Sequence, residues 1–224
     1  MVTSTKNQSA LSAEEKRLAG RVIRSLTAAY PDADCSLRFD SPLQLLVATI
    51  LSAQCTDERV NRVTIDLFAN YPTAVELADV PLKKLEQAIR STGFFRNKAK
   101  NIKACCQKLM EEYDGRVPRT MEELVPLPGV GRKTANVVLG NAYGIASGVV
   151  VDTHVTRICG RLGLVSSKNA VKIERKLNEL LPRKEWIDFS HRCIQHGRRI
   201  CVARTHPHCD ECRMRKFCPR VAVD

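Results

Sequence analysis

Aromatic side chains are scarce in this 224-residue chain, at 5% of all residues. Proteins that bind single-stranded nucleic acid without sequence preference stack successive bases on aromatic rings, so a stacking platform of that kind is not expected. Long apolar runs are also missing, and no stretch approaches the roughly 20 residues of a membrane span. Residues 1–10 are polar and lack the apolar core of a secretory signal. These absences predict an intracellular protein that does not cross a membrane.

Acidic residues are outnumbered, with 24 Asp and Glu against 36 Lys and Arg, which gives a formal net charge of +12. A basic excess of this size attracts polyanions, and nucleic acid is the commonest polyanion partner. Charge alone leaves a second interpretation open, in which the basic residues only keep the protein in solution. The composition therefore favours a nucleic-acid partner without establishing one.

The ten cysteines fall into two sets. Six are scattered, and we expect small buried apolar side chains at these positions, which are Cys35, Cys55, Cys105, Cys106, Cys159 and Cys193. The other four form the pattern Cys201-x7-Cys209-x2-Cys212-x5-Cys218. In a reducing compartment, grouped cysteines more often bind metal than form disulfides. By spacing alone, a tetrahedral zinc ion fits this set at least as well as an iron–sulfur cluster.

Signals for helix starts recur along the chain. Ser12, Thr73 and Thr120 are each followed three residues later by glutamate, the pattern of a capping box. One short apolar run, Val149-Val150-Val151, is a candidate strand, and Asp152 after it is a good N-cap for a further helix. With helical periodicity elsewhere and no convincing second strand, the sequence predicts an all-α fold.

The most informative stretch is Leu127-Pro128-Gly129-Val130-Gly131-Arg132-Lys133-Thr134-Ala135. Two glycines separated by one residue allow a sharp turn and leave the backbone open to a close approach. A helix that starts directly after them points free N–H groups into the turn, which is a natural site for a phosphate. A lone Gly-x-Gly would favour an ordinary turn between helices. The flanking leucine, proline and Arg-Lys-Thr instead favour a hairpin that binds nucleic acid.

This hairpin resembles that of the helix-hairpin-helix superfamily of DNA glycosylases, and of the endonuclease III family in particular. Two further motifs carry the resemblance, Leu51-Ser52-Ala53-Gln54-Cys55-Thr56-Asp57 and Val151-Asp152-Thr153-His154, and it extends from about Ser12 to Cys218. It implies two helical domains: a six-helix barrel with the hairpin at 35–146, and a [4Fe–4S] cluster domain formed by 1–34 plus 147–224. It also implies a DNA cleft between them.

The same resemblance implies a catalytic pair, with Lys133 as nucleophile and Asp152 as carboxylate. An amine that attacks C1′ of a damaged nucleotide displaces the base and leaves a Schiff base, from which strand cleavage follows by β-elimination. A carboxylate can stabilise the positive charge that develops on the sugar. Taken alone, Lys133 would be a phosphate-binding cation and Asp152 a helix cap. With the resemblance, we expect a bifunctional DNA glycosylase and abasic-site lyase that acts on damaged, by expectation oxidised, pyrimidines.

Further DNA contacts are implied in the same way. Gln54 would fill the hole that an extruded nucleotide leaves in the duplex, Phe94 would wedge into the opposite strand, and His154 would contact a phosphate. A helix-end glutamine, a core phenylalanine and a surface histidine are the alternatives. The remaining expected contacts are Gly129, Gly131, Arg132, Thr134 and Arg204. A basic face is also expected around the cysteines, from Arg192, Arg198, Arg199, Arg204, Arg213, Arg215, Lys216 and Arg220.

The resemblance assigns Cys201, Cys209, Cys212 and Cys218 to a [4Fe–4S] cluster. Seven residues separate the first two cysteines, one more than in the commonest family pattern, which leaves the shape of that loop open. We expect a monomer in the cytoplasm or nucleoid that binds double-stranded DNA with damaged bases or abasic sites. Two alternatives stay open: a related glycosylase for pyrimidine dimers or mismatched adenine, and a non-catalytic iron–sulfur protein that binds DNA or senses redox state.

Overall fold

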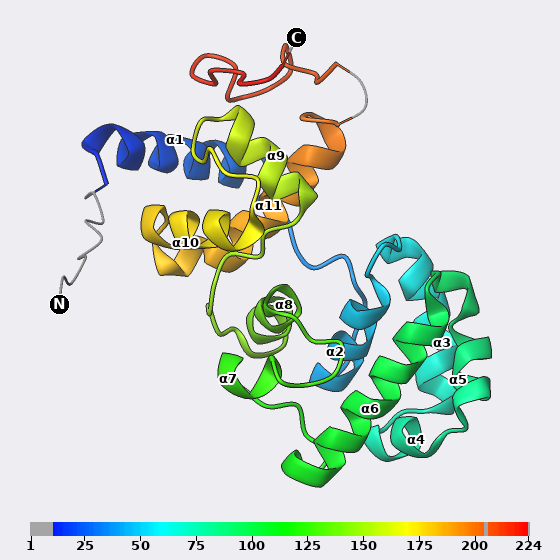
Figure 1. Cartoon of the computed structure of the whole chain (residues 1–224). Helices are drawn as coiled ribbons and strands as arrows, with labels where there is room; N and C mark the ends of the chain where they lie inside the picture. Colours follow the sequence, from blue (N-terminus) through cyan, green and yellow to red (C-terminus); the bar gives the residue numbers. More distant parts are fainter. Residues whose placement is uncertain (1–10, 204–205, 224) are drawn as a thin grey trace, which may run out of the picture. The chain divides into compact units, whose positions relative to one another are not determined.

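The computed structural model describes residues 11–203 and 206–223, and every regular element in them is a helix (Figure 1). This confirms the predicted all-α fold. None of these helices is long and apolar enough to span a membrane. In chain order the helices are α1 (Ala13–Ala29), α2 (Pro42–Leu51), α3 (Asp57–Asn70), α4 (Ala74–Asp79), α5 (Leu82–Ala88), α6 (Phe95–Tyr113), α7 (Met121–Leu124), α8 (Arg132–Tyr143), α9 (Thr153–Arg161), α10 (Ala170–Leu180) and α11 (Trp186–Arg199), with the 3₁₀ turns η1 (Arg90–Thr92) and η2 (Arg183–Glu185).

The chain forms two compact units. Cys35–Ser147 make one, which we call the hairpin unit because it contains the Gly-x-Gly turn. The described parts of Met1–Asp34 and Gly148–Asp224 make the other, the cysteine unit, which holds the four grouped cysteines. Each unit has its own hydrophobic core.

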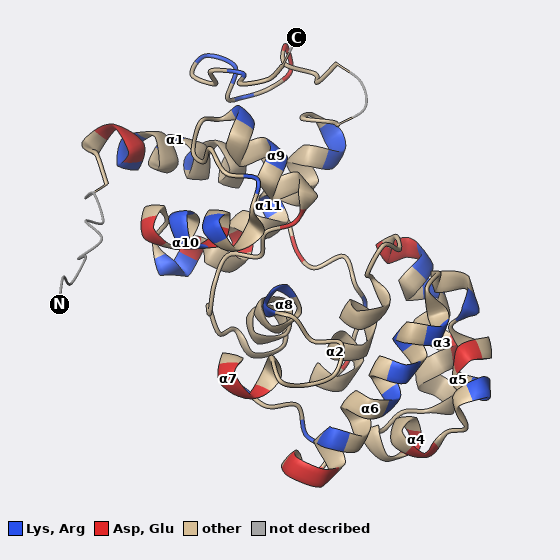
Figure 2. Ribbon diagram, viewed as in Figure 1, with Lys and Arg blue, Asp and Glu red and all other residues tan. Residues whose placement is uncertain are grey.

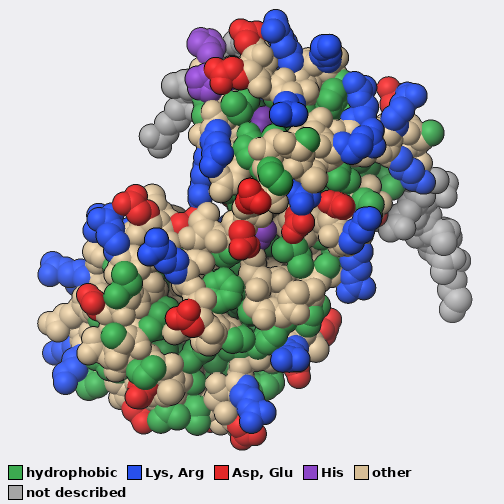
Figure 3. Space-filling view, turned by 180° about the vertical axis from the view of Figure 1, so that it is seen from behind, with side chains coloured by type: hydrophobic (Ala, Val, Ile, Leu, Met, Phe, Trp, Pro, Cys, Tyr) green, Lys and Arg blue, Asp and Glu red, His purple; other side chains and the backbone are tan. Residues whose placement is uncertain are grey.

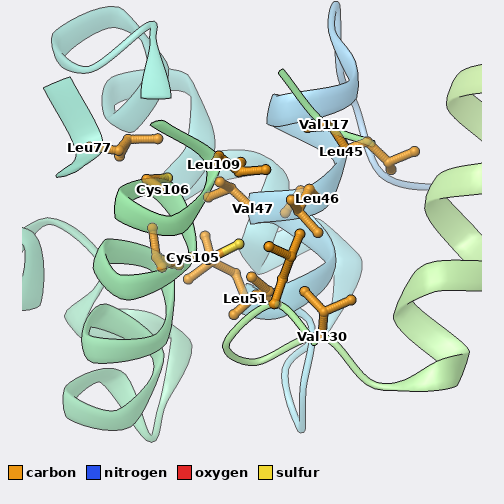
Figure 4. Packing of buried hydrophobic residues seen from close by; sticks show 14 of the residues in the cluster. Leu45, Leu46, Val47, Leu51, Leu77, Cys105, Cys106, Leu109, Val117 and Val130 are labelled. Carbon is orange, nitrogen blue, oxygen red and sulfur yellow. The ribbon is translucent and has the colours of Figure 1, made fainter. Parts of the chain in front are cut away.

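The core of the hairpin unit is built around α2, in which every residue from Leu45 to Leu51 is buried. Helices α3, α6 and α8 pack against it. Buried side chains of α2 and α6 meet there, together with Val130 of the Gly-x-Gly turn (Figure 4). Burying one leucine of this kind stabilises the fold by about 1.5–3 kcal/mol. Because Val130 lies in the same core, the turn is held by the packing that also holds α2.

The cysteine unit packs α1, α9, α10 and α11 around a second core, with Phe189 among its fully buried side chains. Helix α1 begins with the predicted capping box, because Ser12 and Glu15 exchange two hydrogen bonds. The Glu15 carboxylate also accepts a hydrogen bond of 2.6 Å from Lys176 of α10. These hydrogen bonds, first that of Lys176 and then that of the Ser12 backbone, lower the pKa of Glu15 to about 2. The Glu15 side chain thus caps α1 and also connects α1 to α10.

The candidate strand at 149–151 is wrong, since the structure has no strand there. The backbone N–H of Val149 donates to Asn178 Oδ1, and that of Val150 donates to Ser190 Oγ, both at 3.0 Å. Side chains of α10 and α11 therefore take the bonds that a neighbouring strand would have made. The apolar run alone does not distinguish a strand from a segment whose N–H groups are bonded by side chains.

Four of the six scattered cysteines are buried as expected: Cys105, Cys106, Cys159 and Cys193. Cys35 and Cys55 are only partly buried. Burial raises the pKa of Cys105 and of Cys106 to about 12. These two thiols stay protonated at neutral pH and behave as apolar side chains.

Candidate active site and nucleic-acid interface

The Gly-x-Gly turn joins α7 to α8, and its two glycines serve different purposes. Gly129 has a φ of +76°, in the left-handed region, and a Cβ built on it would lie 2.8 Å from Asn101 Cβ. Backbone conformation and packing therefore both require glycine there. Gly131 has a φ of −91°, and a Cβ built on it would meet nothing within 4 Å. The expectation that both glycines serve the turn holds for Gly129 only, while Gly131 leaves open space in front of the backbone.

Helix α8 begins in this open space. Gly131 is its N-cap and supplies no side-chain hydrogen bond to the first turn. Arg132 and Lys133 are the first two helical residues, both exposed, and Thr134 after them is half-buried. The first N–H groups of a helix have no acceptor within it and attract anions. The start of α8 thus combines an accessible amine with a backbone site suited to phosphate.

Asp152 is the N-cap of α9, as its position in the sequence predicts. Its Oδ1 accepts a hydrogen bond of 2.8 Å from the backbone N–H of Val155. The residue is half-buried, and its charge partly opposes the lowering of the His154 pKa that burial causes. The cap bond uses Oδ1, and the second carboxylate oxygen of Asp152 takes no part in it. Capping and catalysis are therefore compatible at this residue.

His154 is half-buried and packs against Gly197 of α11, where an added Cβ would collide with its Nδ1. Arg157 donates a hydrogen bond of 3.1 Å to that Nδ1 and another to the Gly197 carbonyl. Burial lowers the pKa of His154, and the charge of Asp152 opposes this shift. The side chain is thus held by interactions within the protein, and the predicted phosphate contact of His154 stays a prediction.

Gln54 and Phe94 occupy exposed turns at the ends of α2 and η1. Both have left-handed backbone conformations, with φ of 54° and 47°. Phe94 is 64% exposed, so the alternative of a core phenylalanine is wrong. Left-handed backbone costs a non-glycine residue about 1–2 kcal/mol, and such conformations cluster at functional sites. The hairpin unit therefore presents two exposed side chains, Gln54 and Phe94, on strained backbone.

All four grouped cysteines line one cavity in the cysteine unit, together with apolar residues such as Ile158, Leu162 and Met214. Among the described residues, no three His, Cys, Asp or Glu side chains stand close enough together to hold a single metal ion. The four cysteines nevertheless line the same cavity. Four soft thiol donors are the kind of donor set that suits an iron–sulfur cluster.

Two cationic or polar side chains contact these sulfurs directly. Arg161 donates to Cys201 Sγ at 3.2 Å and to the Val202 carbonyl at 3.0 Å. His196 Nε2 lies 3.7 Å from Cys212 Sγ, and its Nδ1 lies 3.0 Å from the Tyr30 hydroxyl. Burial, with a smaller effect of Arg157, lowers the pKa of His196 to about 4, so the ring is neutral at pH 7. A neutral ring can accept from Tyr30 and donate toward Cys212.

Comparison with known proteins assigns the chain to a family. Residues 47–183 match the HhH-GPD superfamily of base excision DNA repair proteins. The chain belongs to this superfamily. It is 55% identical to endonuclease III of Synechocystis sp. over 92% of this chain and 94% of that one. It is 46% identical to endonuclease III of Bacillus subtilis over 84% and 86%. A solved structure of a trapped covalent endonuclease III–DNA intermediate superposes with a TM-score of 0.88, at 43% identity over 92% of this chain and 96% of that one.

These findings confirm the predicted family and activity of this HhH-GPD protein, which is a DNA glycosylase and abasic-site lyase of base excision repair. The solved neighbours include a non-covalent complex of endonuclease III with DNA, which supports DNA binding.

The expected basic face of this HhH-GPD protein needs one correction. Arg192 is half-buried and pairs with Glu185 at 3.1 Å and Asp188 at 2.8 Å, so its charge is neutralised within α11 and η2. Arg204 lies outside the described residues. The exposed basic residues of the region are Arg198, Arg199, Arg213, Arg215, Lys216 and Arg220. Lys and Arg stand out along α11 and the C-terminal loop in the ribbon, and over the surface of this unit in the space-filling view (Figures 2 and 3).

One residue near the exposed turns was missed from the sequence. Lys98 of α6 is buried, and its ammonium group donates to the carbonyls of Leu51 and Thr92. A signal for it was present, because Lys98 falls on the apolar stripe of its helix with Ile102 and Cys105. A lysine at such a position is uncommon and calls for a partner.

Proposed function

We propose that the enzyme releases oxidised pyrimidines from duplex DNA and then cleaves the strand 3′ to the abasic site by β-elimination, with Lys133 as nucleophile. The observation that carries the proposal is the position of this lysine. It is exposed in the first turn of α8, two residues after Gly131, which has no side chain to obstruct an approaching backbone. A phosphate bound by the first N–H groups of α8 would bring the neighbouring sugar to the amine.

In the proposed reaction the lone pair of Lys133 Nζ attacks C1′ of the damaged nucleotide. The C1′–N bond breaks, and the base leaves with the electron pair and takes up a proton. Opening of the sugar ring then gives a Schiff base between Nζ and C1′. Loss of a proton from C2′ expels the 3′ phosphate, and hydrolysis of the imine returns the lysine.

Asp152 would assist the first step. The sugar becomes positively charged as the base departs, and a nearby carboxylate stabilises that charge. The N-cap bond to Val155 holds the Asp152 side chain in one orientation, so little reorganisation accompanies the reaction. This is the role that requires a carboxylate rather than an amide.

The DNA contacts of the proposal come from both units. Gln54 would occupy the place of the extruded nucleotide and Phe94 would separate the opposite strand, which their exposure supports. The hairpin residues Gly129, Gly131, Arg132 and Thr134 would hold phosphates, with His154 and Arg204 as further contacts. The enzyme would act as a monomer wherever the cell keeps its DNA.

The cavity in the cysteine unit would hold a [4Fe–4S] cluster through Cys201, Cys209, Cys212 and Cys218. The shared cavity and the soft donor set support this assignment. When bound, the cluster supplies ligand bonds that fix the C-terminal loop. Arg161 and His196 would orient two of the sulfurs through the contacts described above.

A panel of duplexes, each with one defined lesion, tests the proposed substrate. We expect base release and a 3′ strand break at oxidised pyrimidines and at preformed abasic sites. Removal of adenine from a mismatch or cleavage at pyrimidine dimers in place of these products would contradict the proposed lesion class. Binding of damaged DNA with no release of any base would contradict catalysis itself.

Gly131→Asp should weaken duplex binding without unfolding the protein. The structure has room for the new side chain, and its carboxylate would repel a phosphate at the start of α8. Each phosphate contact that is lost should reduce the slope of log affinity against log salt by about 0.9. Gly131→Ala, which adds only a Cβ into open space, is the matched control and should bind like the parent. Equal binding by the aspartate variant would show that the hairpin does not hold a phosphate.

A further inference from the structure

Lys98 is a buried cation that the proposed chemistry does not use. Its side chain is 4% exposed, within the apolar stripe of α6. The ammonium group donates to the Leu51 carbonyl and to the Thr92 carbonyl, each at 2.8 Å. Burial lowers the pKa of Lys98, and the nearby Cys55 thiol opposes this shift. A methionine would fill a similar volume without this desolvation cost, so packing alone does not account for a lysine.

The two acceptors of Lys98 lie where two helical segments end. Leu51 is the last residue of α2, and Thr92 is the last residue of η1. Gln54 follows Leu51 by three residues, and Phe94 follows Thr92 by two. One ammonium group thus bridges the backbones of two turns that are about 40 residues apart in sequence, a separation at which only tertiary contacts fix a distance.

Each turn also has local hydrogen bonds of its own. The Gln54 turn is closed by a backbone bond from Cys55 to Ser52 at 3.1 Å, and the Phe94 turn by a bond from Gly93 to Arg90 at 3.5 Å. Both bonds are local, and neither relates one turn to the other. The left-handed conformations of Gln54 and Phe94 persist only when the surroundings impose them. Lys98 adds a hydrogen-bonded connection between the two turns.

From this geometry we infer that Lys98 is a positioning residue that fixes the distance between Gln54 and Phe94, so that both side chains enter the duplex as a preformed pair. This inference rests on the proposed DNA contacts of the two residues. Two side chains that must enter a base stack together bind better when their spacing is set beforehand, since less freedom is lost on binding. A misplacement of about 1 Å can reduce a reaction rate by about 100-fold.

The chain offers a matched control in the same helix. Lys103 of α6 also donates to two carbonyls, those of Ala78 and Val80, the second at 2.9 Å. These acceptors lie at the end of α4, in the connection to α5. Lys103→Met therefore removes the same kind of bridge from the same helix without releasing the Gln54 or Phe94 turn.

The first measurement is hydrogen exchange of the parent, Lys98→Met and Lys103→Met proteins without DNA. Lys98→Met should speed exchange at amides 52–55 and 92–95, and leave that of the hairpin at 127–134 unchanged. Lys103→Met should speed exchange near 78–82 instead. Unchanged protection of both the Gln54 and Phe94 turns in Lys98→Met would overturn the inference, whatever the enzyme activity.

The second measurement compares duplex and single-stranded substrates. Lys98→Met should reduce lesion excision from duplex DNA by about 10- to 100-fold. Its cleavage of a single-stranded abasic site should remain close to that of the parent, since no stack has to be entered. In a background of Gln54→Ala and Phe94→Ala, adding Lys98→Met should cause little further loss on duplex DNA, because residues that act through one another are not additive. Full additivity, or an equal loss on both substrates, would overturn the inference.

Circular dichroism establishes that the variants are folded. If Lys98→Met does not fold, Lys98→Gln, which keeps a polar group but reaches fewer acceptors, takes its place in both measurements. If the Gln54→Ala and Phe94→Ala background excises lesions like the parent, the proposed DNA contacts fail. Hydrogen exchange then still decides whether Lys98 joins the two turns.

Discussion

Lys133→Gln should abolish both base release and strand cleavage, with a fall in rate of about 10⁴-fold or more. Glutamine keeps much of the length and hydrogen bonding of the side chain but removes the amine that forms the Schiff base. The substituted residue is exposed in α8, so folding and DNA binding should be retained. Rates on a damaged duplex and on a preformed abasic site, measured under single-turnover conditions, provide the test.

Trapping of the intermediate makes the same prediction specific. Borohydride should link the parent protein covalently to damaged DNA, and peptide mapping should find the link on Lys133. Lys172→Gln, which changes an exposed lysine in the first turn of α10, is the control and should trap like the parent. An adduct undiminished in Lys133→Gln, or mapped to another lysine, would refute the assignment.

Asp152→Asn should slow base release strongly yet retain part of the lyase activity, since amine and aldehyde can still meet.

Cys212→Ser should remove the iron from the protein and make it poorly soluble. The parent should be yellow-brown and contain about four irons per chain, as a cubane cluster requires. Without the Cys212 thiolate, the proposed cluster would lose one of its four bonds to the C-terminal loop. Removal of a structural metal site commonly unfolds the surrounding segment. Iron content by elemental analysis and the visible spectrum report the outcome.

Cys35→Ser is the control for this experiment, because Cys35 is half-buried in the hairpin unit and does not line the cysteine cavity. It should keep the full iron content and colour of the parent. Stoichiometric zinc with no iron, in parent protein from iron-replete cells, would contradict the cluster and favour the alternative that the cysteine spacing left open.

The helix starts were predictable because their signals are local. Ser12 and Thr73 cap the helices that follow them by hydrogen bonds to residues three positions away, and Asp152 caps α9 in the same manner. The motif residues of the site were likewise visible, since the hairpin is continuous in sequence. Residues that act together and are adjacent in the chain, like those of the hairpin, can be recognised from the sequence as one motif.

Other features depend on contacts that no local pattern contains. Asn178 and Ser190 accept the hydrogen bonds of the Val149 and Val150 N–H groups in place of a strand, and both lie in helices later in the chain. The apolar stripe of α6 indicates that Lys98 is buried, but its two acceptors are backbone carbonyls, which every residue has, so the sequence does not indicate which carbonyls it binds. Arg192 was expected in the basic face, but in the structure its charge is paired with Glu185 of η2 and Asp188 of α11.

The close packing of His154 on Gly197 has a consequence for the reading of natural variants. Any side chain at position 197 would collide with His154 and with the guanidinium of Arg157. Arg157 also donates to the carbonyl of Cys201, at 2.9 and 3.0 Å. A change at this glycine would thus displace His154 and Arg157, and through Arg157 it would affect Cys201, the first of the four grouped cysteines. In a screen for iron-deficient protein, substitutions at position 197 belong among the hits even though they alter no cysteine.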